Sequence, residues 1–163
     1  MLQISHLYKN YGKFLAVNDL NLHVPKGDLF GFAGPNGAGK TKQLIDLIHS
    51  AVESENGSVV CIEKGTKLRF DLDIRVRLID YQEYEMKTLP LLKGFISGLH
   101  AGNFDISHVF IDSFYKLVPD ATVADVEDFV QWCESFGEAN QMSFTVVVSE
   151  DPAKASESMK RFM

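Results

Sequence analysis

The sequence lacks several features that mark other classes of protein. Its 163 residues include only two cysteines, Cys61 and Cys133, too few for a disulfide framework, so we expect reduced thiols. No apolar run approaches the roughly 20 residues that span a bilayer. Residues 1–10 lack the long apolar segment of a secretory signal. We therefore expect a cytoplasmic protein with no direct membrane insertion.

An excess of basic residues is also missing. The chain has 16 Lys and Arg against 22 Asp and Glu, a net charge of -6, so no nucleic-acid partner is expected. The charge is uneven: residues 1–41 hold four lysines and two aspartates, a net +2, which leaves -8 for residues 42–163. A hydrophobic fraction of 45% and a charged fraction of 23% are ordinary for one domain. We expect a single domain over residues 1–163.

The hydrophobic pattern alternates between strand-like and helix-like segments. We expect strands at residues 2–7, 14–24, 29–33, 58–62, 75–79, 108–112 and 144–148. We expect helices from the glycine-rich loop to Asn56-Gly57, over 88–100, from a capping box at Thr122 and Asp125, and over 152–162. The alternation predicts a three-layer α/β P-loop NTPase fold with a mainly parallel sheet. A short antiparallel strand pair lies in residues 1–33, and residues 34–163 form the P-loop core.

Residues 34–41 read GPNGAGKT, a complete P-loop pattern between an expected strand and an expected helix. In such a loop, backbone N–H groups and the helix N-terminus face phosphate oxygens. Lys40 would reach the β- and γ-phosphates, and the Thr41 hydroxyl would bind Mg²⁺. The predicted cofactors are ATP and Mg²⁺, and the predicted nucleotide-binding residues are Gly34, Pro35, Asn36, Gly37, Ala38, Gly39, Lys40 and Thr41.

A motif that ends in a carboxylate follows downstream of the P-loop. Residues 108–112 read HVFID, an apolar run that ends in Asp112, which is the pattern of a strand whose aspartate holds Mg²⁺. Lys40 and Asp112 are the predicted catalytic residues, and Thr41 and Asp112 the predicted metal ligands. Ser113 stands where many ATPases carry a glutamate that polarises the attacking water. The sequence thus predicts nucleotide binding without an evident base for hydrolysis.

Residues 1–41 resemble the start of an ABC transporter ATP-binding subunit, in the stretch LYKNYGKFLAVNDLNLHVPKGDLFGFAGPNGAGKT. The resemblance implies that Tyr11 stacks on adenine, although a tyrosine packed in a turn remains an alternative. After Thr41 the resemblance to this family weakens. No LSGGQ-type signature follows Thr41, and Glu150 stands in the place of the family's switch histidine. We therefore expect an incomplete transporter ATPase.

Residues 42–163 resemble small stand-alone P-loop ATP-binding proteins of Firmicutes, in the segments GKTKQLIDLI, GSVVCIEKG and HVFIDSFYKL. The layout is also similar to that of bacterial-type thymidine kinases, without the glutamate after the strand aspartate and without a cysteine-rich zinc lobe. Two origins stay open. The chain is either a chimera joined at the P-loop or one divergent lineage.

Three functions follow from these patterns. The first is a Mg-ATP-binding protein with weak or partner-dependent hydrolysis. The second is a nucleoside-kinase-like phosphotransferase, for which Asp80, Glu83 and Glu85 are the nearest candidate bases. The third is a non-catalytic nucleotide-binding module. A homodimer and a protein partner both remain open.

Overall fold

The computed structural model describes the backbone of residues 2–11, 14–24 and 29–33, and the backbone and side chains of residues 39–148. Strands alternate with helices after the first three strands. The strands are β1 (Leu2–Tyr11), β2 (Phe14–Val24), β3 (Leu29–Ala33), β4 (Ser58–Glu63), β5 (Arg77–Asp80), β6 (Ile106–Ile111) and β7 (Ser143–Val148). The helices are α1 (Lys40–Ser54), α2 (Leu89–Gly102), α3 (Phe114–Leu117) and α4 (Val123–Asn140), with 3₁₀ turns η1 (Lys67–Phe70) and η2 (Tyr81–Tyr84).

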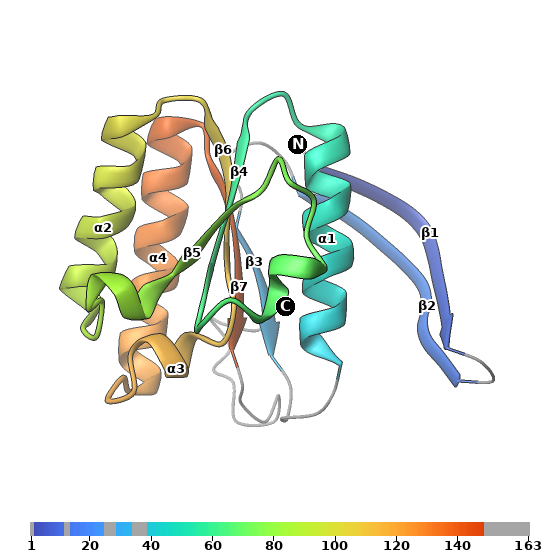
Figure 1. Cartoon of the computed structure of the whole chain (residues 1–163), viewed down its shortest axis with the longest axis horizontal. Helices are drawn as coiled ribbons and strands as arrows, with labels where there is room; N and C mark the ends of the chain where they lie inside the picture. The colour runs from blue at the N-terminus through green and yellow to red at the C-terminus, as the bar shows by residue number, and fades with distance from the viewer. Residues whose placement is uncertain (1, 12–13, 25–28, 34–38, 149–163) are drawn as a thin grey trace.

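Five strands form one sheet in the order β3-β7-β6-β4-β5, and every neighbouring pair is parallel. Helix α1 covers one face of this sheet, and α2 and α4 cover the other (Figure 1). The result is a three-layer α/β architecture of the kind found in P-loop NTPases. Because all strands are parallel, their carboxyl ends meet at one edge, where ligands bind in such sheets.

Strands β1 and β2 pair with each other in a separate antiparallel sheet, which extends beyond α1 (Figure 1). They are 10 and 11 residues long, so this pair is longer than the short one expected. The helix expected over residues 152–162 lies outside the described residues.

Two hydrophobic clusters hold the layers together. On the α1 face, Leu44, Leu47 and Ile48 of the helix pack against alternate strand residues such as Cys61 and Phe110. The opposite face collects the intervening strand residues with the apolar stripes of α2 and α4. This division follows from the strand period of two, which sends successive side chains to opposite faces. The same alternation determines to which face of the sheet the carboxylates at the strand ends point.

The predicted helix ends are close to those observed. Helix α4 begins after Thr122, and the Thr122 hydroxyl and the Asp125 carboxylate form the expected capping box. Strand β5 begins at Arg77 rather than at residue 75, because Asp73 accepts hydrogen bonds from the Arg75 backbone N–H and guanidinium, which fixes a turn there. None of the helices in the described ranges is long and apolar enough to cross a membrane.

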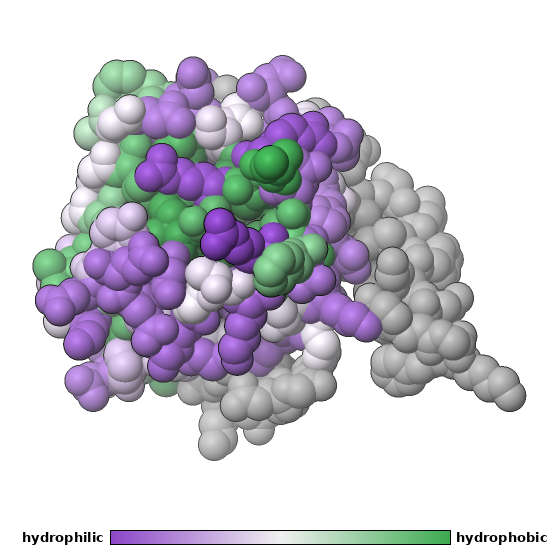
Figure 2. Space-filling view, viewed as in Figure 1, coloured by the Kyte–Doolittle hydropathy of each residue, from purple (hydrophilic) through white to green (hydrophobic). Residues whose placement is uncertain are grey.

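Some apolar side chains remain exposed. Figure 2 shows green apolar areas between purple polar ones on the face that carries β5 and η1. Phe70 and Ile74, in and after η1, are 95% and 99% exposed. Nothing among residues 39–148 covers these two side chains.

Candidate functional site

At the carboxyl edge of the sheet, a carboxylate ends or directly follows each of three neighbouring strands. Glu63 of β4 pairs in register with Asp80 of β5. On the other side, Ile62 pairs with Ile111 of β6, and the Asp112 N–H donates to the Ile62 carbonyl over 2.9 Å. Asp112 therefore lies beside Glu63. The order along the edge is Asp80, Glu63, Asp112.

All three carboxylates lie on the α1 face of the sheet. Cys61, Leu78 and Phe110 belong to the cluster on the α1 side, and each precedes one of the carboxylates by two residues. Side chains two residues apart along a strand point to the same face. The carboxylates thus share the face on which α1 begins.

Helix α1 brings Lys40 to this edge. Gly39, the residue before the helix, has φ 76°, a left-handed conformation that disfavours any side chain. Lys40 is buried, and its pKa is lowered by burial, an effect that the nearby Asp112 opposes and Lys116 reinforces. The lysine and the aspartate that the sequence predicts as catalytic residues, 72 positions apart, therefore lie close enough to interact electrostatically.

Ser113 follows Asp112 in an unusual conformation. Its φ of 57° lies in the left-handed region, where non-glycine residues are uncommon and are often found at functional sites. The Ser113 hydroxyl donates to the Asp112 Oδ1 over 3.2 Å. Both residues are buried. The hydrogen bond orients the aspartate from the side of the short helix α3.

Glu63 is a site residue that the sequence reasoning missed. It is 2% exposed, and its Oε1 accepts a hydrogen bond from the Leu68 N–H over 3.0 Å. Its pKa is raised by burial and by the neighbouring Asp112 and Asp80, while the Leu68 hydrogen bond and Lys67 act in the opposite direction. A signal was present in the sequence, since SVVCIE has the same form as HVFID: an apolar run that ends in a carboxylate.

The donor set at this edge fits Mg²⁺ better than a metal with an all-protein cage. No cluster of three or more His, Cys, Asp or Glu side chains in the described part of the chain could hold a metal ion. Mg²⁺ uses one or two protein oxygens together with phosphates and waters. The Asp112 carboxylate and the exposed Thr41 hydroxyl are ligands of that kind, so a bound Mg²⁺ would neutralise phosphate charge there.

The remaining predicted site residues cannot be placed in this geometry. Gly34, Pro35, Asn36, Gly37 and Ala38 lie outside the described residues, as does Glu150. Tyr11 ends β1, but its side chain is not described. Their roles in binding phosphate and adenine stay predictions.

A comparison with protein families identifies the domain. The model of the ABC transporter family matches residues 17–161. The chain belongs to the ABC transporter family. It is an ATP-binding P-loop domain of that family, and the match extends on both sides of residue 41.

Individual relatives of this ABC transporter domain match a shorter stretch. The taurine import ATP-binding protein TauB of Escherichia coli O6:K15:H31 is 46% identical over 65 residues, which is 40% of this chain and 25% of TauB. The lantibiotic transport ATP-binding protein SrtF of Streptococcus pyogenes is 38% identical over 60 residues, 37% of this chain and 26% of SrtF. The matches thus cover about a quarter of the length of these relatives.

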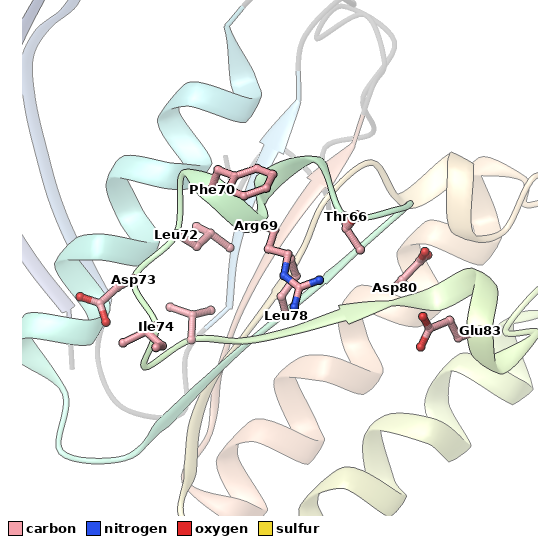
Figure 3. Close-up of a pocket in the computed structure, with 10 residues that line it drawn as sticks. Thr66, Arg69, Phe70, Leu72, Asp73, Ile74, Leu78, Asp80 and Glu83 are labelled. Carbon is pink, nitrogen blue, oxygen red and sulfur yellow. The ribbon is translucent and has the colours of Figure 1, made fainter.

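A cavity of about 610 Å³ lies beside the carboxylate row of the domain. Figure 3 shows Asp80 and Glu83 at one end of it, Asp73 and Ile74 at the other, and Arg69 between them. The Asp80 Oδ1 accepts hydrogen bonds from the Gly65 and Gln82 N–H groups over 2.9 and 3.0 Å. Two of the three candidate kinase bases therefore border a cavity, and one of them is held by the backbone.

The amino edge of the same sheet contains a second buried polar cluster. His108 of β6 is fully buried; its Nδ1 lies 2.8 Å from the Glu55 Oε1 and its Nε2 2.9 Å from the Thr145 hydroxyl. The imidazole also stacks on Phe110, with ring centroids 4.0 Å apart. The pKa of Glu55 is lowered, because its hydrogen bond and charge interaction with His108 outweigh burial, which alone would raise it. This cluster ties α1 to β6 and β7.

Proposed function

We propose that this domain binds Mg-ATP at the carboxyl edge of the sheet and hydrolyses it slowly or only with a partner. One observation carries the proposal: Lys40 is buried at the start of α1 and is electrostatically coupled to Asp112 at the end of β6. A buried lysine is costly unless it has an anionic partner. Bound phosphates would supply further negative charge beside the helix N-terminus.

The residues would divide the work as follows. Residues 34–39 would wrap the phosphates with backbone N–H groups, and Tyr11 would contact the adenine. Lys40 would neutralise charge on the β- and γ-phosphates. Thr41 and Asp112 would hold Mg²⁺, which supplies charge neutralisation for phosphoryl transfer. Ser113 in place of a glutamate supports slow hydrolysis, because a hydroxyl is a weaker proton acceptor than a carboxylate.

We also propose a transport role for the whole protein. The names of TauB and SrtF assign them to import and transport, and the family match supports a similar task on the cytoplasmic side of a membrane, with a protein partner or a second copy. The match across residues 17–161 supports one divergent lineage over a chimera joined at the P-loop.

Nucleotide-dependent stabilisation tests the binding proposal. We expect ATP with Mg²⁺ to raise the melting temperature, since a ligand held by the folded state at about 100 times its Kd adds about 2.7 kcal/mol of stability. ADP and GTP with Mg²⁺, and ATP with a chelator, are the matched comparisons. No stabilisation by any of these nucleotides contradicts the proposal.

Turnover measurements separate the three functions. Release of phosphate from ATP in the absence of an acceptor supports the ATPase, whereas ADP formation that requires a nucleoside supports the kinase alternative. Tight binding without turnover under either condition, with a transporter partner as well as without one, supports the non-catalytic module. The hydrogen bonds that the Asp80 Oδ1 accepts from the Gly65 and Gln82 N–H groups disfavour the kinase, because they leave this oxygen less available to a substrate hydroxyl.

A further inference from the structure

Strand β4 ends in a glutamate, Glu63, next to the proposed ATP site. This site has no carboxylate at the usual position for binding the attacking water. Ser113 leaves the usual position after Asp112 without a carboxylate. One strand away, Glu63 ends β4 at the level of Asp112 and points to the α1 face, as Cys61 does two residues earlier. The same face receives Lys40. A carboxylate therefore lies next to the metal-binding aspartate without following it in sequence.

The groups around Glu63 do not favour a buried carboxylate, so a contribution to stability does not explain why this residue is a glutamate. Its described hydrogen-bond donor is a neutral backbone group, the Leu68 N–H. The strands on both sides bring Asp112 and Asp80, whose negative charges disfavour a carboxylate at this position, and Lys67 is the cation that opposes them. A neutral Gln would accept the same hydrogen bond without this repulsion. Unfavourable charges of this kind are often retained at functional sites.

We propose that Glu63 binds and orients the water that attacks the γ-phosphate of ATP. This role rests on the proposed function, because it requires ATP bound at the P-loop. The water oxygen forms a bond to the γ-phosphorus, and the bond from that phosphorus to the β–γ bridging oxygen breaks, with its electron pair leaving on ADP. One water proton passes to the Glu63 carboxylate and from there to solvent as phosphate departs.

The neighbouring carboxylates fit this role less well. Asp80 lies one strand farther from Asp112, and its Oδ1 already accepts two backbone hydrogen bonds. Glu83 and Glu85 are exposed in and after η2, so bulk water surrounds them. Glu63 combines burial with adjacency to Asp112. Both properties favour control of a single water molecule.

The test compares Glu63→Gln with Glu55→Gln in the full chain. Glu55 is a matched control because it too is a buried glutamate, and it lies near the amino end of the same strand. In both variants the amide oxygen can still accept the native hydrogen bond. We expect Glu63→Gln to lower kcat for ATP about 100-fold or more while Kd for Mg-ATP stays within about threefold. Glu55→Gln should leave both constants unchanged at a temperature where it is fully folded.

Chemical rescue covers the case in which Glu63→Gln fails to fold. Glu63→Ala opens space at the site, and sodium formate supplies a small carboxylate; we expect formate, and not chloride, to restore turnover. A wild-type kcat in Glu63→Gln, or an absence of formate rescue in a folded Glu63→Ala, overturns the role. Absence of hydrolysis by wild-type protein that binds ATP also overturns it, whereas absence of ATP binding overturns the proposed function itself.

Discussion

Glu55 and Glu63 are buried near opposite ends of β4 and sit in opposite electrostatic environments. Glu55 faces His108, which in turn contacts Thr145, and its pKa is lowered although burial alone would raise it. Glu63 faces Asp112 and Asp80, and burial together with these charges raises its pKa. At one end of the strand His108 lies against one oxygen of the carboxylate, and at the other end the carboxylate lies among like charges.

This difference suggests that the two edges of the sheet contribute to different properties of the domain. A paired buried charge links elements and is costly to break. An imperfectly compensated charge lowers stability, and the carboxyl edge carries three carboxylates near a buried lysine. We therefore expect substitutions at the amino edge to change the free energy of unfolding and substitutions at the carboxyl edge to change nucleotide chemistry.

The largest expected effect is at the amino edge. His108→Ala removes the partner of Glu55 and Thr145 and the ring that stacks on Phe110. Truncation of a buried aromatic-sized side chain to Ala costs about 3–5 kcal/mol, so we expect a decrease of that size in the free energy of unfolding, measured with urea. ATP affinity of the folded variant should be unchanged.

An exposed histidine provides the control for this substitution. His49 lies on the exposed side of α1, and His49→Ala should change the free energy of unfolding by less than about 0.5 kcal/mol. A His108→Ala variant as stable as His49→Ala would show that the amino-edge cluster does not hold the sheet to α1.

The next effect concerns Lys40 at the carboxyl edge. Lys40→Ala removes the cation beside Asp112, and we expect Mg-ATP affinity to fall at least about 100-fold, or about 2.7 kcal/mol. The free energy of unfolding without nucleotide should change by less than about 1 kcal/mol, because burial already disfavours the charged lysine. Calorimetric titration and urea unfolding measure the two quantities. Equal ATP affinity in wild type and variant would contradict the assignment.

The sequence predicts local features of this domain well. The capping box at Thr122 and Asp125 and the strand that Asp112 follows depend on residues close in sequence, so short patterns suffice. The alternation of strands and helices likewise indicates a parallel sheet. What the pattern does not contain is the order of the strands, since β7 lies between β3 and β6 although it comes last of the three in sequence.

Strand order explains which parts of the site escaped prediction. Glu63 lies beside Asp112 only because β4 lies directly beside β6, and Glu55 contacts His108, which is 53 positions away in sequence. The run SVVCIE indicates a carboxylate at the end of a strand, but no periodicity or spacing in the sequence indicates which residues Glu63 and Glu55 contact. Lys40 and Asp112 are farther apart in sequence, but the P-loop pattern indicates the lysine and the apolar run HVFID indicates the aspartate.

Glu63→Gln should increase the free energy of unfolding, by less than the decrease expected for His108→Ala. Because the folded-state pKa of Glu63 lies above its unfolded value of 4.5, the folded state binds more protons in the range between the two values, and stability falls as pH rises through it. The neutral amide removes this loss. We expect the variant to be more stable than wild type by about 0.5–1 kcal/mol near pH 7, and the difference to vanish below about pH 4.5. Destabilisation at pH 7 would mean that the carboxylate is better compensated than its neighbours suggest.

The smallest expected effect is the loss at low pH of the contribution that Glu55 makes to the free energy of unfolding. The Glu55 carboxylate stabilises the fold, whereas the Glu63 carboxylate destabilises it. Its folded-state pKa lies below the unfolded value of 4.5, so the unfolded state binds more protons in that interval. Its contribution to stability is therefore complete above about pH 4.5 and is lost as pH falls through the folded-state pKa. Urea unfolding of wild type and Glu55→Gln between about pH 3 and pH 6 measures this contribution. Both pairs of stability curves should converge as the pH falls, but above that range wild type should be more stable than Glu55→Gln and less stable than Glu63→Gln. Parallel curves for Glu55→Gln would show that the His108 contact acts through shape and hydrogen bonding rather than through charge.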